Sequence, residues 1–290
     1  MIYRTMRHIK TFSLFESVQI LTPEQKNFLD KYTKGGPWSL NPSTGLVDVD
    51  GDFDCSREGL NDLLGIRFGR AFWNFYCNGN NLTSLEGAPQ TVGGDFYCSD
   101  NSLQTLEGAP QTVGGDFSCN KNKLTTIEGA PQIVNGAFYC SGNMLTSLTG
   151  APQTVGGEFG CTDNKLTSLE GAPETVGGEF SCYNNRLTSL AGAPKTIRGE
   201  FSSDGLSMQK GTWSMDTLIK IFLDGTPNQQ QLVAPLVDPK VIQQQIDENP
   251  EGMLIKLKDV LKHPQFQELK WPERLEQEKG LLSDLGDVGL

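Results

Sequence analysis

Hydrophobic residues in the middle of the chain recur in a fixed order about every 21 residues. Most periods hold a Phe-x-Cys alternation, two leucines three residues apart, an Ala-Pro pair and a Val-Gly-Gly run. Because alternate side chains of a strand point to the same side, Phe and Cys share one face of a short strand. The positions are Phe75, Phe96, Phe117, Phe138, Phe159, Phe180 and Phe201, with Cys77, Cys98, Cys119, Cys140, Cys161 and Cys182.

This period predicts stacked coils rather than one compact core. Successive Phe-x-Cys strands then form a parallel sheet with about 4.8 Å between neighbours, and their side chains line a continuous interior. An Asn follows each strand and is expected to satisfy backbone groups of adjacent coils. Ala-Pro excludes a helix, and Gly-Gly is expected to permit a tight return into the next strand. The back of the coil is therefore predicted to be extended or a short helical turn.

The order of these residues resembles the leucine-rich repeat, Leu-x-x-Leu-x-Leu-x-x-Asn/Cys-x-Leu. The stretch Leu-Thr-Ser-Leu-Glu-Gly-Ala-Pro at residues 82–89 is similar to the short bacterial type of this repeat and to repeat proteins of marine bacteriophages and metagenomes. The resemblance implies an α+β fold class, namely a leucine-rich-repeat solenoid with one parallel β-sheet and little convex helix. It implies little about function.

Both flanks of the repeats depart from the template. Thr22, Pro23 and Gln25 form a capping-box signature, which predicts a helix from Pro23 to about Tyr32. Residues 38–40 and 46–54 predict a hairpin around the turn 41–45, and helix and hairpin together are expected to cap the first coil. Stretches at 216–223, 239–247 and 253–262 look helical. The predicted domains are an N-terminal arm, helix and hairpin cap (1–50), the solenoid (51–205) and a small C-terminal helical domain (206–290).

Side chains that flank Phe and Cys point away from the interior and form the exposed face of the sheet. Acids recur before Phe, and Tyr recurs between Phe and Cys, which suits recognition of a basic surface. The alternative is that these polar residues only keep the sheet soluble. We therefore predict a non-catalytic protein-binding module, with a structural or virion-associated (packaged) bacteriophage component as the alternative. The predicted partner-binding residues are Asp52, Asp54, Asn74, Tyr76, Asp95, Tyr97, Asp116, Tyr139, Glu158, Glu179, Tyr183 and Glu200.

Charge narrows the class of partner. Lys and Arg number 24 against 35 Asp and Glu, a net charge of −11, which repels phosphate backbones. The expected partner is a protein with a basic or neutral surface and not a nucleic acid. No run of about 18 apolar residues predicts a membrane span. The odd number of Cys, 7, indicates reduced thiols and a cytoplasmic location, in the host cytoplasm or the virion if the protein is phage-encoded.

Several clusters have both a chemical and a structural interpretation, and no metal or cofactor is expected. The Cys column offers thiolates for zinc or copper(I), but one Cys per coil without Cys-x-x-Cys favours packing. Four Asp between residues 48 and 54 suggest a calcium loop, but they lack the EF-hand spacing and alternate with hydrophobic residues, as in a half-buried strand. Regular Thr arrays resemble ice-binding solenoids, although curved coils would spoil a lattice match. The arrays are Thr125, Thr146, Thr167 and Thr188, and Thr154, Thr175 and Thr196.

No catalytic set stands out, so the chain is predicted not to be an enzyme. Bacterial repeat effectors with a ubiquitin-ligase domain use a catalytic Cys, and no Cys follows Cys182. Leu14 to Glu16 resembles the Leu-x-Glu site of prohead proteases, with an amphipathic arm over the first coil as the alternative. Phe72 and Trp73, which replace Gly-Gly, are expected to pack against a terminal cap, with an exposed anchor as the alternative.

Overall fold

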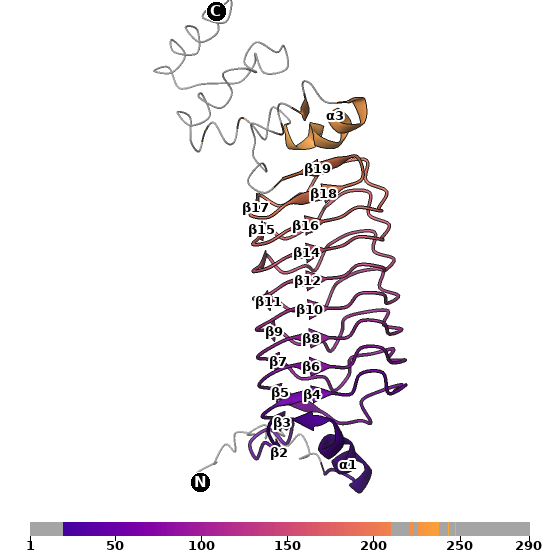
Figure 1. Ribbon diagram of the computed structural model, residues 1–290, viewed down its shortest axis with the longest axis vertical. Coiled ribbons are helices and arrows are strands. Elements are labelled where there is room, and N and C mark those ends of the chain that lie inside the picture. The colour runs from indigo at the N-terminus through magenta and orange to yellow at the C-terminus, as the bar shows by residue number, and fades with distance from the viewer. Residues whose placement is uncertain are drawn as a thin grey trace, which may run out of the picture.

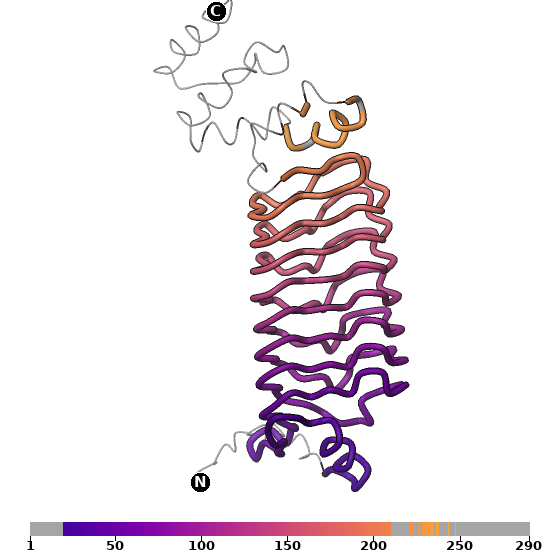
Figure 2. Tube along the Cα trace, in the orientation of Figure 1, coloured from indigo at the N-terminus to yellow at the C-terminus, as the bar shows by residue number. Residues whose placement is uncertain are grey.

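The computed structural model describes residues 20–209, 218, 221–222, 226–237, 243 and 247. Its coils stack into a β-solenoid in which each turn of about 21 residues contributes one strand to each of two sheets (Figure 1). Figure 2 shows the chain winding from the N-terminal coils to the C-terminal coils in a straight column. The repeat solenoid that the sequence predicts is confirmed.

The first sheet has 10 strands and is built from the Phe-x-Cys segments. Its parallel strands pair in register, so that Phe117 lies between Phe96 and Phe138. Strands β1 and β19 are antiparallel and lie at the two ends. The strands in spatial order are β1 (Thr33–Lys34), β4 (Asp52–Asp54), β6 (Phe75–Tyr76), β8 (Phe96–Tyr97), β10 (Phe117–Ser118), β12 (Phe138–Tyr139), β14 (Phe159–Gly160), β16 (Phe180–Ser181), β18 (Phe201–Ser203) and β19 (Leu206–Met208).

The prediction of a single parallel sheet is wrong, because the Thr-Val segments and their equivalents, together with three strands between residues 38 and 71, form a second sheet of 9 strands. Thr and Val are β-branched and favour extended backbone, and coil stacking places successive pairs in register, such as Val92 beside Val113. The back of the coil is therefore extended, one of the two forms that the period predicts. The strands in spatial order are β17 (Thr196–Ile197), β15 (Thr175–Val176), β13 (Thr154–Val155), β11 (Ile133–Val134), β9 (Thr112–Val113), β7 (Thr91–Val92), β5 (Phe68–Ala71), β3 (Val47–Val49) and β2 (Trp38–Leu40).

One continuous hydrophobic interior lies between the two sheets. From Phe53 to Phe201 the Phe rings of successive coils stack at centroid distances between 5.0 and 5.9 Å, and each ring is fully buried. The Cys, the leucines and the Val of the second sheet fill the remaining space. Burying one such side chain contributes about 1.5–3 kcal/mol, so this interior is the main stabilising feature of the fold.

A ladder of buried Asn side chains connects successive coils. Asn122 Nδ2 donates to the carbonyl oxygens of Cys98 and Cys119, both at 3.1 Å, and its Oδ1 accepts from Leu103 N at 3.0 Å. Equivalent bonds recur along the column, as at Asn143. The predicted role of Asn is therefore confirmed: it satisfies backbone groups of adjacent coils that would otherwise be buried without partners.

Glycine is required for a different reason from the predicted tight return. A Cβ on Gly114 would collide with the carbonyl of Gly93 in the preceding coil, and one on Gly115 would collide with the Asp95 carboxylate. The close approach of coils therefore leaves no room for a side chain at Gly115 as the backbone stands, and Gly recurs at this second position of the pair, whereas Asn135 and Arg198 occupy the first position in two other coils. Backbone freedom matters instead at the glycine before Ala-Pro, such as Gly108 with a φ of 87°, which L side chains rarely adopt.

Helix α1 (Pro23–Tyr32) begins and ends where the sequence predicts. Its capping box is complete, and Gln25 Nε2 also donates to the carbonyl of Leu64 at 2.8 Å. The rings of Phe28 and Tyr32 lie 5.7 and 6.4 Å from the ring of Phe53, so the helix packs against the first coil.

The predicted hairpin is present but shorter than expected. Strands β2 and β3 pair antiparallel, and the second arm then bends at Gly51. A Cβ on Gly51 would collide with the carbonyl of Lys34, so this bend also depends on a close backbone approach. The residues after the bend form β4 in the other sheet, which places Asp48 and Asp52 in different sheets.

Helix α3 (Pro227–Val233) and the 3-10 helix η1 (Ala234–Leu236) follow the last coil and were not predicted. The carbonyl of Leu232 accepts from Leu190 N at 2.9 Å, so α3 contacts the solenoid. The helices predicted at 216–223, 239–247 and 253–262 fall mostly outside the described residues. Within the described part of the chain, no helix has the length and apolar character needed to cross a bilayer.

Candidate functional site

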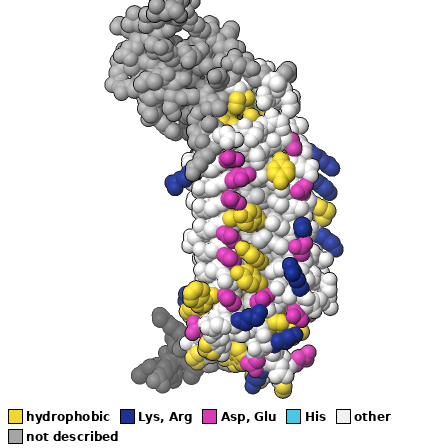
Figure 3. All heavy atoms as spheres, in the orientation of Figure 1, with side chains coloured by type: hydrophobic (Ala, Val, Ile, Leu, Met, Phe, Trp, Pro, Cys, Tyr) yellow, Lys and Arg dark blue, Asp and Glu magenta, His cyan; other side chains and the backbone are white. Residues whose placement is uncertain are grey.

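The exposed surface of the ten-stranded sheet consists of three columns of side chains, which lie before Phe, between Phe and Cys, and after Cys. We call it the acidic face; its first rung is Asp52, Asp54 and Ser56, and its last is Glu200, Ser202 and Asp204. Figure 3 shows acidic and hydrophobic-class side chains, which include Tyr, gathered along this sheet. Every predicted partner-binding residue lies on this face and is half-buried or exposed.

Acids of the N-terminal coils have a structural role that the sequence did not reveal. Asp95 Oδ1 accepts from Asp116 N at 2.8 Å, and Asp116 Oδ1 accepts from Ala137 N at 2.7 Å. The side-chain amide oxygen of Asn74 likewise accepts a hydrogen bond from Asp95 N at 2.7 Å. Each side chain thus satisfies a backbone donor of the next coil, which a half-buried N–H requires. One oxygen of each carboxylate is therefore already occupied within the fold.

The C-terminal coils carry the longer Glu in the same column. Among the described contacts, the carboxylates of Glu158, Glu179 and Glu200 accept no backbone hydrogen bond; Glu158 accepts from Tyr139 Oη at 2.8 Å and Glu179 from Ser202 Oγ at 3.5 Å. Glu158 and Glu200 are exposed, and Glu179 is half-buried. These carboxylates are consequently more available to a ligand than the Asp residues of the N-terminal coils.

Three tyrosines of the acidic face, Tyr76, Tyr97 and Tyr139, have pKa values raised above the usual value. Tyr76 and Tyr97 lie with ring centroids 5.1 Å apart. Desolvation, followed by the charges of Asp95 and Asp116, raises the pKa of Tyr97 to about 12. Desolvation and the hydrogen bond to Glu158 likewise raise the pKa of Tyr139. The negative charge of the acidic face therefore comes from carboxylates, and the tyrosines contribute rings and hydroxyl donors.

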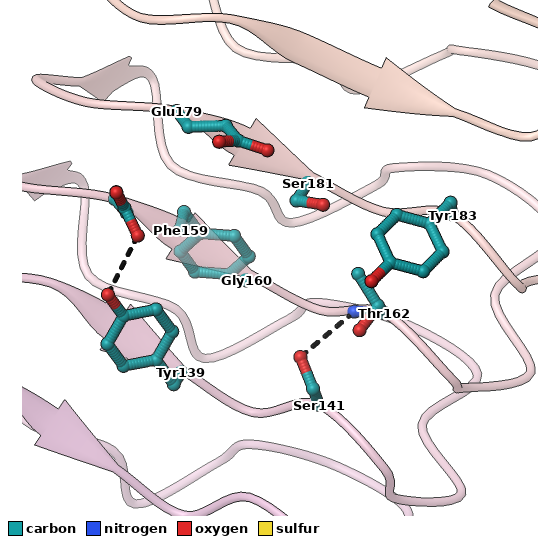
Figure 4. Close-up of a pocket in the computed structure, with 9 residues that line it drawn as sticks. Tyr139, Ser141, Phe159, Gly160, Thr162, Glu179, Ser181 and Tyr183 are labelled. Carbon is teal, nitrogen blue, oxygen red and sulfur yellow. Dashed lines mark hydrogen bonds between the residues drawn. The ribbon is translucent and has the colours of Figure 1, made fainter.

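A hollow of about 250 Å³ lies over Gly160, which occupies the position between Phe and Cys that is Tyr at Tyr76, Tyr97 and Tyr139. In Figure 4, Tyr139 and Tyr183 lie on opposite sides of Gly160, and Glu179 lies on the strand beyond it. We call this space the Gly160 hollow. Its lining residues are Tyr139, Ser141, Glu158, Phe159, Gly160, Thr162, Glu179, Ser181 and Tyr183.

The small residues that shape this hollow were not identified from the sequence. Ser141, Gly160, Thr162 and Ser181 were not among the predicted partner-binding residues, although four of the predicted ones line it. The available signal was Gly160 itself, the one residue without a side chain at the position between Phe and Cys, because a glycine there opens space on the sheet surface.

The charge of the acidic face has little internal compensation. None of its three columns contains Lys or Arg. At the N-terminal edge, Lys34 Nζ lies 3.2 Å from Asp54 Oδ2. Partial burial works to raise the pKa of Asp54, but hydrogen bonds from Ser56 and the Lys34 ammonium outweigh it and leave the pKa below its usual value. The uncompensated charge therefore lies in the middle and C-terminal coils.

The structure also decides three alternatives elsewhere. Every Cys is a free, fully buried thiol whose pKa is raised by desolvation, as at Cys119, which confirms the packing interpretation. The Asp run is a half-buried strand segment, as favoured, although Gly51 divides it into β3 and β4. The expected packing of Phe72 and Trp73 is wrong, because they are 42% and 63% exposed. Residues 14–16, the candidate protease site, lie outside the described residues.

Comparison of the chain with protein-family models, with curated proteins and with solved structures gave no match. The function is therefore inferred from the geometry and charge of the two sheet surfaces.

Proposed function

We propose that this protein is a non-catalytic protein-binding module that uses its acidic face to hold a partner with a basic surface. The observation that carries the proposal is a rigid sheet surface on which carboxylates and tyrosines occur together without Lys or Arg in its columns. Complementary charge directs encounter and selects partners, and Tyr is enriched among residues that dominate binding energy.

Rigidity supports this proposal. Backbone amides pair from coil to coil around the turn, for example Cys119 N to Tyr139 O at 2.9 Å and Lys123 N to Leu103 O at 2.9 Å. The buried Asn ladder adds side-chain bonds at each coil. A surface that is already ordered loses little conformational entropy on association, so more of the contact energy contributes to affinity.

Assignment to the leucine-rich-repeat class, with an N-terminal cap and a C-terminal helical domain, belongs to the same proposal. The paired buried leucines and the Asn ladder support the class, whereas the second sheet distinguishes this chain from repeats with a convex helix. The packing of Phe28 and Tyr32 on Phe53 supports a capping role for α1, because an open end would expose the terminal rung of the core. Fully buried free thiols agree with a reducing, cytoplasmic compartment.

A structural or virion-associated component of a bacteriophage is the second candidate. The straight stack of nearly uniform coils supports it, because such a column is suited to a rigid spacer (Figure 2). In that role the protein would contact copies of itself or other structural proteins rather than capture a separate basic partner.

Site-specific photo-crosslinking tests the proposal. A benzophenone amino acid at Tyr97 places the crosslinker on the acidic face, and the same residue at Ile133, which is 52% exposed on the nine-stranded sheet, is the matched control. We expect full-length protein to crosslink in native extract to a basic protein from position 97, with at least tenfold lower yield from position 133. The yield is expected to fall as salt is raised, because exposed charges are screened.

Equal yields from both positions, or crosslinking that is insensitive to salt, would contradict the binding role of the acidic face. Crosslinks only between copies of this chain would favour the structural candidate instead.

A further inference from the structure

The Gly160 hollow has the size of a site for one side chain rather than for a whole small molecule. Its volume of about 250 Å³ falls below the roughly 300–1,000 Å³ of pockets that enclose drug-sized ligands. It lies within the acidic face, where a partner's surface would rest. A single projecting side chain of that partner is therefore the occupant that the dimensions fit.

The walls of the hollow combine two aromatic rings with acceptors. Tyr139 and Tyr183 lie on opposite sides, and Glu158 and Glu179 come from neighbouring coils, with strand spacing of about 4.8 Å between them. Thr162, 8% exposed, adds a hydroxyl, and its one recorded side-chain hydrogen bond is a long one, 3.5 Å, to Asp163. Rings attract a cation over their faces, and carboxylates accept its N–H groups.

Building on the proposed function, we propose that the Gly160 hollow binds an arginine side chain of the partner protein, between the rings of Tyr139 and Tyr183 and against the carboxylates of Glu158 and Glu179.

Arginine fits the hollow better than lysine. A guanidinium is planar, stacks on aromatic faces and presents five N–H donors in a fixed fork, so it can address acceptors on two neighbouring coils at once. An ammonium is a compact point charge that retains its water more strongly. The carboxylates of Glu158 and Glu179 belong to different coils, and the several N–H groups of one guanidinium can donate to both of them.

A neutral sugar is the main competitor, since Tyr rings and carboxylates also contact sugars. Charge favours the cation. Glu158, Glu179 and Glu200 occupy successive rungs, and no cationic side chain of the face columns offsets them. A guanidinium relieves this like-charge repulsion, whereas a sugar leaves it unchanged.

The test uses N-acetyl-L-arginine amide as the probe on the full-length protein, followed by amide NMR shifts. We expect saturable shifts at Gly160 and Thr162 with a Kd on the order of 1 mM, equivalent to about −4 kcal/mol. The lysine analogue should bind at least threefold more weakly. The citrulline analogue, which keeps the shape of arginine but lacks its charge, should bind at least tenfold more weakly.

Variants of the hollow give the decisive comparison. Glu158→Gln with Glu179→Gln removes both charges and should weaken arginine binding at least tenfold. Gly160→Tyr places a ring beside Tyr139, as Tyr97 lies beside Tyr76, which should fill the hollow and abolish the shifts. The control Asp95→Asn removes a carboxylate elsewhere on the face while keeping its backbone acceptor, as Asn74 does, and should change Kd less than twofold.

The double Gln variant keeps the test decisive even if Gly160→Tyr fails to fold, because Glu158 is exposed and Glu179 half-buried on the acidic face, so neither change alters the buried interior. Citrulline binding as tightly as arginine, or shifts confined to other coils, would overturn the inference. So would saturable binding of methyl glucoside without binding of arginine, which would assign the hollow to a sugar.

The outcome separates this inference from the proposed function. If position 97 still crosslinks a basic protein in the double Gln background, the acidic face binds its partner without an arginine anchor, and only the inference fails. If position 97 gives no salt-sensitive crosslink in the unmodified protein either, the proposed function fails as well.

Discussion

The two sheets are both built mainly from short parallel strands that pair in register from coil to coil, but they expose different side chains. The ten-stranded sheet presents Asp, Glu and Tyr, whereas the Thr-Val strands of the nine-stranded sheet present Thr, with Gln before each Thr in most coils. The ladder itself therefore does not dictate what is exposed. Columns of carboxylates lie on the ten-stranded sheet, and this is the surface that we propose binds a partner.

The exposed columns also differ in how much they vary between coils. Along the nine-stranded sheet the outward position is Thr in every coil from Thr91 to Thr196 except at Ile133. Along the acidic face the position between Phe and Cys changes among Asp, Tyr, Ser and Gly. A uniform column makes a repetitive surface, whereas a varied column can form a local feature such as the Gly160 hollow. A curved stack would not match a flat ice lattice, but this stack is straight (Figure 2). Curvature is therefore no argument against ice binding by the Thr column.

The two sheets should differ most in what their buried residues contribute to stability. Phe117 contacts the rings of Phe96 and Phe138 at centroid distances of 5.7 and 5.1 Å and is fully buried, as is Val113 of the same coil. We expect Phe117→Ala to lower the free energy of unfolding by about 3–5 kcal/mol and Val113→Ala by about 2 kcal/mol. Urea denaturation measures both. Equal losses would mean that Phe117 contributes less to stability than the buried size of its ring predicts.

Much of the fold was predictable because the repeat samples each position many times. Phe, Cys, Leu and Asn keep their spacing through the coils, and each has one physical use, in the core or in the ladder. The second sheet was missed because its segments, such as Thr91–Val92, are followed by Gly-Gly and show no alternation, whereas Phe-x-Cys alternates in the first sheet. Extended pairing there arises from contact between coils, which no single stretch of sequence contains.

The acidic face was predictable as a surface but not in its detail. Alternation about Phe-x-Cys places every chosen residue outside, which is correct. The sequence did not indicate that Asp95 and Asp116 bond backbone amides of the next coil, since that contact spans 21 residues. Nor did it identify Thr162 as a wall of the hollow, because its place there depends on the rings of two neighbouring coils.

Within the acidic face, the Asp and Glu rungs should respond differently to truncation. Ala137 is buried, at 6% exposure, and its backbone N–H donates to Asp116 Oδ1. We expect Asp116→Ala to cost about 1–2 kcal/mol of stability, because this donor loses its acceptor. Glu158→Ala should change stability by less than about 0.5 kcal/mol, since its carboxylate accepts only from an exposed hydroxyl.

Asp116→Asn serves as the control for that pair, because Asn74 makes the same bond with an amide oxygen. It should retain nearly full stability in thermal denaturation. Loss of stability in Asp116→Asn equal to that in Asp116→Ala would show that the charge, and not the backbone acceptor, is what the coil requires.

The smallest expected effect tests the charge difference between the two faces directly. Ser181→Lys places an ammonium beside the Gly160 hollow, near Glu158 and Glu179, whereas Thr154→Lys places one on the neutral nine-stranded sheet. Because the first lysine relieves repulsion among carboxylates, it should raise stability by about 0.2–1 kcal/mol at low salt. The second should change stability by less than that. Thermal denaturation at low ionic strength and in about 1 M salt distinguishes the two variants. The Debye length falls to about 3 Å in 1 M salt, which should remove the gain of Ser181→Lys and leave Thr154→Lys unaffected. A gain at Ser181 that persists in high salt would come from packing of the lysine stem across Gly160, and the acidic face would then lack the field that the binding proposal requires.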